Sequence, residues 1–338
     1  MSGKTYCILG GGGAFGIHCA IYLLQRADPK KVVGIGRNPL RPEPFNLGIR
    51  SCALYEYRTH HIVHEQDMLL EYLGELQPDV IINFAAQGEG AASWRHSWRF
   101  FDTNATALVR LYEELSRSAW VRHKGSEFRF VHVGTSELYG SVTTPAREDA
   151  PIVPSSPYAA SKAAFDLYLL AMVRQGGGAP ATIVRPSNCY CSGQLLHRII
   201  PRAVVSGLLG SRVPLHGGGY ARKSYLHARD LARAILLVSG DHRCVGQAYN
   251  VGPSEPTSIR EVAEMCAAVV GKAFDDVFDV APERIGQDAC YWLDSSAIRA
   301  LGWQPEIDWV RGLEDVVVWA KKYLTELRGW PTDYQLRA

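Results

Sequence analysis

The sequence predicts an α/β protein with a doubly wound parallel sheet and a smaller C-terminal α/β lobe. In the first half of the chain, apolar runs of strand length alternate with amphipathic helical segments. This alternation is typical of βαβ units, whose strands are parallel. Beyond Arg185 the pattern becomes irregular, and prolines and glycines separate short elements. We therefore expect one domain over residues 1–185 and a second lobe over residues 186–338, interleaved with the first.

Each element of the first domain is expected where its pattern is clearest. The expected strands are Tyr6–Leu9, Lys31–Ile35, Val80–Phe84, Phe128–Val133 and Ala181–Arg185. The expected helices are Ile17–Arg26, Asp67–Leu76, Phe101–Ser118 and Tyr158–Gln175. The last two helices carry apolar residues on more than one face, so we expect a homodimer or homotetramer that buries them.

Composition narrows the class of partner. The 338 residues are 47% hydrophobic and 21% charged, enough to bury a large core. The formal net charge is only +2, which gives no reason to expect nucleic acid or an acidic membrane surface as a partner. No stretch reaches the roughly 18 uncharged apolar residues that a membrane span needs. We expect a cytoplasmic protein that binds a small molecule, with its eight scattered cysteines reduced and no metal site.

A glycine-rich turn follows the first expected strand. Gly10, Gly13 and Gly16 form GxxGxxG, with Ala14 and Phe15 inside the motif, where a helix opens. Glycine is needed there because the turn is tight and the backbone must approach a pyrophosphate at the helix N-terminus. The motif predicts a Rossmann-type domain that binds a nicotinamide dinucleotide through these five residues.

The end of the second expected strand bears on which dinucleotide is bound. An enzyme that reads the ribose 2′-hydroxyl places a carboxylate there, whereas this chain has Gly36 followed by Arg37. An arginine can pair with a 2′-phosphate through its planar fork, and Arg41 could assist. We therefore expect NADP, with NAD as the alternative; otherwise both arginines are solvated loop residues.

Tyr158 and Lys162 lie four residues apart at the start of an expected helix. Ser155 and Ser156 are typical capping residues, and Pro157 follows them at the first helical turn. This spacing puts both side chains on one helix face. The ammonium and the positive end of the helix both favour the phenolate, so Tyr158 can act as a base toward a sugar hydroxyl.

The order of these motifs resembles that of the extended short-chain dehydrogenase/reductase superfamily, and within it the nucleotide-sugar 4,6-dehydratases. The segment Thr135–Gly140, TSELYG, is similar to the corresponding segment of GDP-mannose 4,6-dehydratases. Dehydratases that act on dTDP-glucose carry Asp-Glu where this chain has Ser136-Glu137. Gly34–Arg37 and His227–Asp230 also resemble the GDP-mannose branch, which uses NADP.

The resemblance implies roles for particular residues. The catalytic group is Thr135, Ser136, Glu137, Tyr158 and Lys162. Besides the glycine loop and Arg37, the cofactor is expected to contact Ala85, Ala86, Asn104, Tyr158, Lys162 and Arg185. The nucleotide sugar is expected to contact Gln87, Ser93, Asn188, Arg198, Lys223 and Arg284. Residues 1–185 are then the NAD(P)-binding Rossmann domain, and residues 186–338 are the sugar-nucleotide-binding lobe. Relatives carry His-Val in place of Glu89-Gly90 and arginine in place of Lys223.

The implied reaction is that of a lyase acting through transient oxidation. Tyr158, helped by Thr135, removes the proton from the sugar 4-hydroxyl while hydride leaves carbon 4 for the nicotinamide. Glu137 then removes the acidified hydrogen from carbon 5, water leaves from carbon 6, and the hydride returns to carbon 6. The same segment also resembles UDP-glucuronate decarboxylases, and epimerases and 4-ketoreductases are further alternatives. A catalytically silent sensor on the same fold is a different class, against which the intact set of Thr135, Tyr158 and Lys162 argues.

Overall fold

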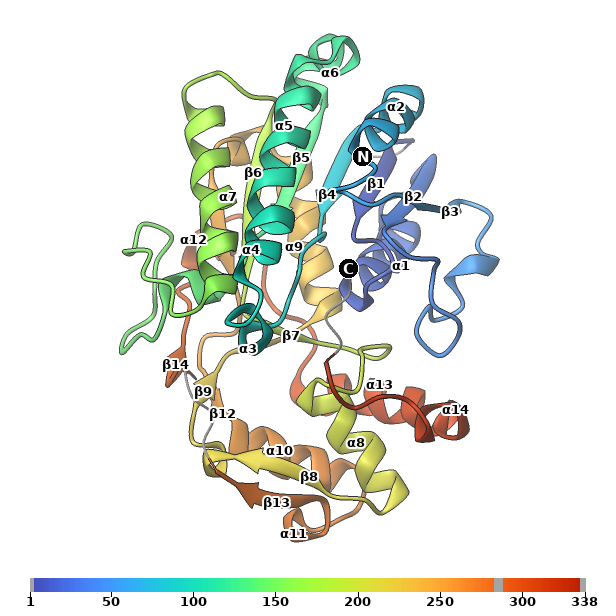
Figure 1. Ribbon diagram of the computed structural model, residues 1–338, viewed down its shortest axis with the longest axis vertical. Helices are drawn as coiled ribbons and strands as arrows, with labels where there is room; N and C mark the ends of the chain where they lie inside the picture. Colours follow the sequence, from blue (N-terminus) through green and yellow to red (C-terminus); the bar gives the residue numbers. More distant parts are fainter. Residues whose placement is uncertain (1–2, 283–287, 335–338) are drawn as a thin grey trace.

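A seven-stranded sheet is the centre of the molecule (Figure 1), in a computed structural model that describes residues 3–282 and 288–334. Its strands, in order across the sheet, are β11 (Ala248–Val251), β6 (Ala181–Pro186), β5 (Arg129–Val133), β4 (Val80–Asn83), β1 (Thr5–Leu9), β2 (Lys31–Gly36) and β3 (Tyr55–Thr59). Every neighbouring pair is parallel. The chain therefore winds outward in both directions from the adjacent strands β1 and β4, which confirms the predicted doubly wound fold.

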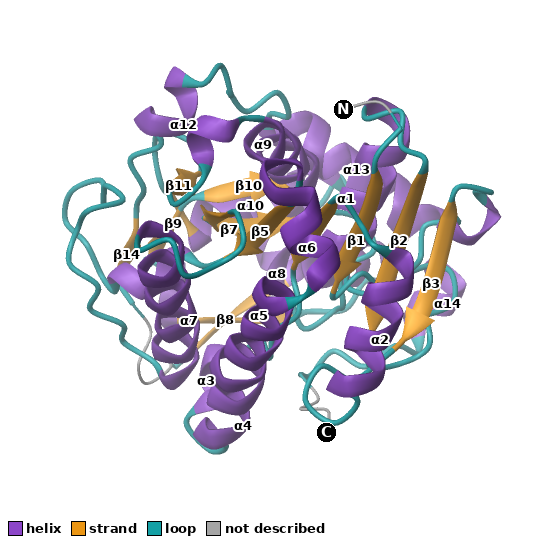
Figure 2. Cartoon of the chain, turned by 90° about the horizontal axis from the view of Figure 1, so that it is seen from above, coloured by secondary structure: helices purple, strands orange, loops and turns teal. Residues whose placement is uncertain are grey.

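Helices cover both faces of this sheet (Figure 2). One face carries α2 (Gln66–Leu76), α5 (Ala107–Arg117) and α7 (Pro157–Arg174), with the short α6 (Ala119–Lys124) after α5. The other face carries α1 (Ala14–Arg26) and α9 (Ala228–Gly240), which pack against each other. All residues of β1 and β5 are buried, as expected for central parallel strands covered on both sides.

A smaller lobe lies below the carboxyl ends of the strands in Figure 1. Its helices are α8 (Ile199–Leu209), α10 (Ile259–Val269), α11 (Phe274–Val277), α13 (Trp309–Lys322) and α14 (Leu324–Arg328). Its short strands are β8 (Val213–His216) with β13 (Phe278–Ala281), and β9 (Arg222–Lys223) between β12 (Thr257–Ser258) and β14 (Cys290–Tyr291). Buried side chains of α8, α10 and α13, such as Val204, Val262 and Val316, give this lobe a core of its own.

The two parts are interleaved along the chain. After β6, strand β7 (Asn188–Tyr190) pairs with β10 (Tyr225–His227) where the parts meet, and α9 and β11 then return to the main sheet. The helix α12 (Ser296–Ala300) also packs beside β11. The division at residue 185 stays a prediction, and elements on the far side of it contribute to both parts.

The remaining expectations about class concern membranes, thiols and metals. Within residues 3–282 and 288–334, none of the helices combines the length and apolar character that a bilayer crossing requires. All eight cysteines are free thiols. The same described residues contain no group of three or more histidine, cysteine, aspartate or glutamate side chains arranged to hold a metal ion.

Candidate active site

The glycine loop joins β1 to α1 in close contact with β4. Gly10 has φ of 79°, and a Cβ added to it would lie 2.7 Å from the backbone nitrogen of Ala85. A Cβ on Gly16 would lie 2.6 Å from the carbonyl oxygen of Gly10. Gly13 is the N-cap residue of α1 and offers no side chain there. The loop therefore brings bare backbone to a helix N-terminus, which fits a dinucleotide pyrophosphate.

At the end of β2 the structure explains why no carboxylate is present. A Cβ on Gly36 would lie 2.4 Å from the hydroxyl oxygen of Tyr57, which donates a hydrogen bond of 2.8 Å to the Asn38 carbonyl. Tyr57, from the neighbouring strand β3, thus fills the space that an acidic side chain would take. A guanidinium nitrogen of Arg41 lies 3.5 Å from the carbonyl oxygen of Gly12, so a cation borders the glycine loop.

A cavity of about 500 Å³ opens between the two parts of the molecule at the carboxyl ends of the strands. This size is typical of a site for a small molecule. It brings together ten of the predicted site residues: Phe15, Ala86, Thr135, Ser136, Glu137, Tyr158, Lys162, Asn188, Arg198 and Lys223. Its lining reaches from Phe15 of the glycine motif to Lys223 of the smaller lobe, whereas Gly10, Gly13, Ala14 and Gly16 are not part of it.

Tyr158 stands in the first turn of α7. The Ser156 hydroxyl caps this helix by accepting a 3.1 Å hydrogen bond from the Ala159 N–H, with proline at the first helical position. The pKa of Tyr158 is raised, because burial and the Glu137 charge outweigh the hydrogen bond from Thr135 that lowers it. The phenol is therefore protonated at rest, and its activation depends on charges nearby.

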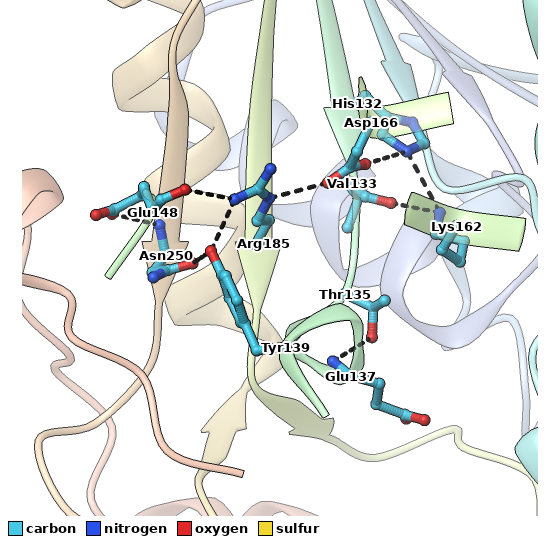
Figure 3. Close-up of polar contacts among 10 residues, drawn as sticks. All are labelled: His132, Val133, Thr135, Glu137, Tyr139, Glu148, Lys162, Asp166, Arg185 and Asn250. Atoms are coloured by element: carbon cyan, nitrogen blue, oxygen red, sulfur yellow. Dashed lines mark hydrogen bonds and ion pairs between the residues drawn. The ribbon is translucent and has the colours of Figure 1, made fainter. Parts of the chain in front are cut away.

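Lys162 lines the same cavity as Tyr158. Its Nζ donates a 2.7 Å hydrogen bond to the Val133 carbonyl (Figure 3). Burial lowers its pKa to about 8, and the Asp166 charge opposes this shift. The predicted ammonium is thus present in the cavity wall, held by the main chain of β5.

Glu137 carries its carboxylate in the same cavity. Its N–H donates a 3.3 Å hydrogen bond to the Thr135 Oγ1, and one carboxylate oxygen lies beside Gly90. Burial raises its pKa, and the positive charges of Lys223 and Arg198 act in the opposite direction. A carboxylate with a raised pKa beside a tyrosine and a threonine is suited to accept a proton from carbon.

Cationic side chains of the smaller lobe face Glu137. Arg198 donates a 2.8 Å hydrogen bond to the Gly88 carbonyl and lies 3.5 Å from the Glu89 carboxylate. The Lys223 Nζ lies 4.4 Å from the centre of the Tyr291 ring. These cations suit a diphosphate. Arg284, also predicted to bind substrate, lies outside the described residues.

Other predicted site residues are not among those that line the cavity. Asn104 is fully buried, and its amide bonds the backbone N–H and carbonyl of Gln87 and the hydroxyl of Ser161. The Ser93 hydroxyl donates to the Gly90 carbonyl. The Arg185 guanidinium is buried and bonds Asp166 and Tyr139. In the structure, these side chains hold the loops and strands that form the cavity. Ala85 and Arg37 also stand outside the lining.

Two residues beside Lys162 were not singled out from the sequence. His132 lies 3.5 Å from the Lys162 Nζ and 3.3 Å from the Asp166 carboxylate. A signal was present, because histidine within an apolar strand and aspartate one turn beyond Lys162 are polar residues at positions of the predicted core.

The comparisons place this geometry in a known class of enzyme. Residues 6–252 match the family described as the NAD dependent epimerase/dehydratase family. The chain belongs to this family of enzymes.

Two similar curated proteins are both dTDP-glucose 4,6-dehydratases. The protein of Streptomyces niveus is 36% identical over 243 residues, covering 71% of this chain and 69% of that protein. The protein of Xanthomonas campestris pv. campestris strain B100 is 30% identical over 340 residues, covering 95% and 93%.

Solved structures agree in fold along almost the whole chain. The dTDP-glucose 4,6-dehydratase of Bacillus anthracis in complex with NAD has a TM-score of 0.82 at 28% identity and covers 97% of this chain and 98% of its own. That of Streptomyces venezuelae, also with NAD bound, has a TM-score of 0.83 at 28% identity and covers 94% and 97%.

Proposed function

We propose that this enzyme is a nucleotide-sugar 4,6-dehydratase that converts a nucleoside-diphosphate hexose to the 4-keto-6-deoxy sugar. The observation that carries the proposal is the position of Glu137 in one cavity with Thr135 and Tyr158. Epimerases and ketoreductases need the tyrosine and the hydride carrier, whereas a carboxylate base beside them is what an elimination requires. The relatives named as 4,6-dehydratases support the same reaction.

The residues of the chain divide the work by step. A bound nicotinamide dinucleotide supplies the hydride acceptor and, at the end of the cycle, the hydride donor. Tyr158, once it has lost its own proton to solvent and is the phenolate that the Lys162 ammonium favours, takes the proton of the 4-hydroxyl, and Thr135 is hydrogen-bonded to it. Glu137 takes the hydrogen of carbon 5 once the ketone at carbon 4 has made it acidic. The proton for the departing hydroxyl comes from Glu137, or from Ser136 through a water.

The cofactor and the sugar nucleotide are finer proposals. Arg37 and Arg41 at the end of β2 favour NADP, whereas solved relatives were crystallised with NAD, which is the second candidate. The Thr135–Gly140 segment favours GDP-mannose, and the names of the relatives favour dTDP-glucose. We expect Arg198 and Lys223 to hold the diphosphate of either. A cytoplasmic location also stays a prediction.

A panel of GDP-, dTDP-, UDP- and CDP-hexoses with mass detection tests the reaction class. We expect loss of one water from one of these substrates, with no net consumption of cofactor. In heavy water the product should carry deuterium at carbon 5, because that carbon is reprotonated from solvent, while carbon 6 receives hydride internally. Loss of carbon dioxide from a UDP-glucuronate substrate, or a product that retains its carbon 6 hydroxyl, would replace the proposal with a decarboxylase or an epimerase.

A further inference from the structure

A chain of buried polar side chains runs behind Lys162, away from the cavity (Figure 3). His132 and Asp166 are completely buried, and Arg185 and Lys162 are 1% and 2% exposed. Of these four, only Lys162 lines the cavity. Burying charged groups costs free energy unless each is paired, so such a cluster needs a reason.

Neighbouring hydrogen bonds determine the protonation of His132. The Asn83 Oδ1 accepts a 3.1 Å hydrogen bond from the Ala85 N–H, which fixes the orientation of this amide. The Asn83 Nδ2 must then be the donor toward the His132 Nδ1, 3.0 Å away. In an imidazolium, Nδ1 would also carry a hydrogen, and its N–H would then face the N–H of the Asn83 amide with no acceptor between them. His132 is therefore neutral, with its hydrogen on Nε2.

The Nε2 edge of His132 faces two groups of opposite charge. One Asp166 oxygen lies 3.3 Å from Nε2, and the Lys162 Nζ lies 3.5 Å from it. Because Nε2 carries the hydrogen, it cannot accept one from the ammonium, and its N–H lies near the Asp166 Oδ1. The Lys162 ammonium therefore donates its hydrogen bond to the Val133 carbonyl, 2.7 Å away. The imidazole thus fixes the spacing between Asp166 and Lys162.

The other Asp166 oxygen is held from the opposite side. It accepts a 2.9 Å hydrogen bond from the Arg185 Nε, and the same guanidinium donates to the Tyr139 hydroxyl at 2.7 Å. A Cβ on Gly134 would lie 2.9 Å from this oxygen, so the glycine makes room for the carboxylate. Lys162 and Arg185 contribute two positive charges and Asp166 one negative charge. The cluster therefore has one surplus positive charge, which a Tyr158 phenolate would neutralise.

We propose that Asp166, anchored by Arg185 and spaced by neutral His132, is a positioning residue that keeps the Lys162 ammonium charged and aimed for the activation of Tyr158. The inference rests on the proposed function, in which that ammonium favours the tyrosine base.

The surroundings of Lys162 set the direction of the expected effect. The titratable groups that act on the Lys162 ammonium are His132 from β5 and Asp166 from α7. Arg185 from β6 pairs with Asp166, and Tyr158 and Glu137 line the cavity that Lys162 also lines. Burial lowers the pKa of Lys162 to about 8, and the Asp166 charge raises it. Removing this charge therefore lowers the pKa of Lys162 further, so that less ammonium is present at neutral pH.

The test is Asp166→Asn in the cofactor-bound enzyme, with lysine labelled by carbon-13 at Cε and the Lys162 signal assigned through Lys162→Arg. We expect the titration midpoint of Lys162 to fall by about one pH unit or more. The alkaline limb of the rate of cofactor reduction should move with it. Glu148→Gln is the matched control, because it removes the same charge from a carboxylate that lies beyond Arg185, outside the four-residue cluster, where the Glu148 Oε1 accepts from the Asn250 N–H. Its midpoint should equal that of the unaltered enzyme.

A second measurement needs no substitution in the charged cluster. Nitrogen-15 spectra of the unaltered enzyme should show His132 neutral with its hydrogen on Nε2 from pH 6 to 9, assigned by loss of the signal in His132→Gln. An imidazolium, the other tautomer, or an unmoved Lys162 midpoint in folded Asp166→Asn overturns the inference. A merely structural role would lower the rate equally at every pH. If no nucleotide sugar is turned over, the proposed function fails, while both titrations still decide this proposal.

Discussion

Glu137 and Tyr158 line one cavity, but Tyr158 acts on the 4-hydroxyl and Glu137 on the hydrogen of carbon 5. Substituting each of them should therefore stop the reaction at a different step. Glu137→Gln keeps the shape of the side chain and removes the base. It should still oxidise substrate, accumulate reduced cofactor by absorbance, and release no water. Tyr158→Phe should show neither absorbance change nor water loss, because the first proton transfer fails. Normal turnover of Glu137→Gln would contradict the assigned role of this carboxylate.

Arg37 provides the second prediction at the scale of a residue. A charge-assisted pair with a 2′-phosphate contributes about 1.5–3 kcal/mol, so Arg37→Ala should weaken NADP binding by that amount and leave NAD binding unchanged. Calorimetric titration of both cofactors measures this difference. Arg58→Ala, on β3 and paired with Glu56, is the control and should affect neither. Equal affinity of the unaltered enzyme for NAD and NADP would refute the preference.

The sequence predicts the catalytic residues better than it predicts the buried polar residues that support the site. Thr135, Glu137 and Tyr158 follow from motif order, and the structure brings them to one cavity. Contact of Asn104 and Arg185 with the cofactor stays a prediction, and in the structure their polar groups bond protein neighbours. Sequence order cannot show this, because whether a buried polar group faces a ligand or a neighbouring strand depends on tertiary packing.

At the scale of elements, the N-cap of α7 links stability to the site. Ser156→Ala should lower the free energy of unfolding by about 1 kcal/mol and also reduce turnover, because the freed first turn carries Tyr158. Ser258→Ala removes the equivalent cap of α10, where the Ser258 hydroxyl accepts a 3.1 Å hydrogen bond from the Glu261 N–H. Ser258→Ala should lower the free energy of unfolding by a similar amount and change turnover little. Denaturant unfolding and steady-state rates together test this, and equal rate losses in both variants would contradict it.

The expected elements were largely found, and the differences have physical causes. The expected helix Phe101–Ser118 is three segments: the end of α4 (Ser97–Phe101), a π-helical turn over Asp102–Thr106, and α5. The wider turn carries Asn104, whose bonds to Gln87 link it to the loop after β4. Strand β3 was not expected, because its residues Tyr55–Thr59 are only partly apolar at the sheet edge. Helix α3 (Gly90–Ser93) is too short for a periodic signal.

At the scale of the whole molecule, the predicted dimer has a surface to test. Trp98 and Leu167, on α4 and α7, are 70% and 52% exposed, and these helices contact each other. Leu167→Glu should convert the assembly to monomers by light scattering, because a charge would be buried at the helix interface. Val310→Glu, on α13 and 66% exposed, is the matched control and should leave the mass unchanged. A monomeric mass for the unaltered protein would refute the prediction.

The late return of β11 to the sheet has a consequence for biosynthesis. When a ribosome has released only residues 1–186, β6 is an open sheet edge with unpaired backbone groups, a template for pairing with other chains. The edge closes only after the segments from β7 through α9 and β11 have emerged. A fragment ending at residue 186 should therefore aggregate during synthesis, whereas the whole chain, which supplies β11 and also α10 and α13 to cover α8, should remain in the supernatant. Nascent chains of this protein would need chaperone shielding over that interval of translation.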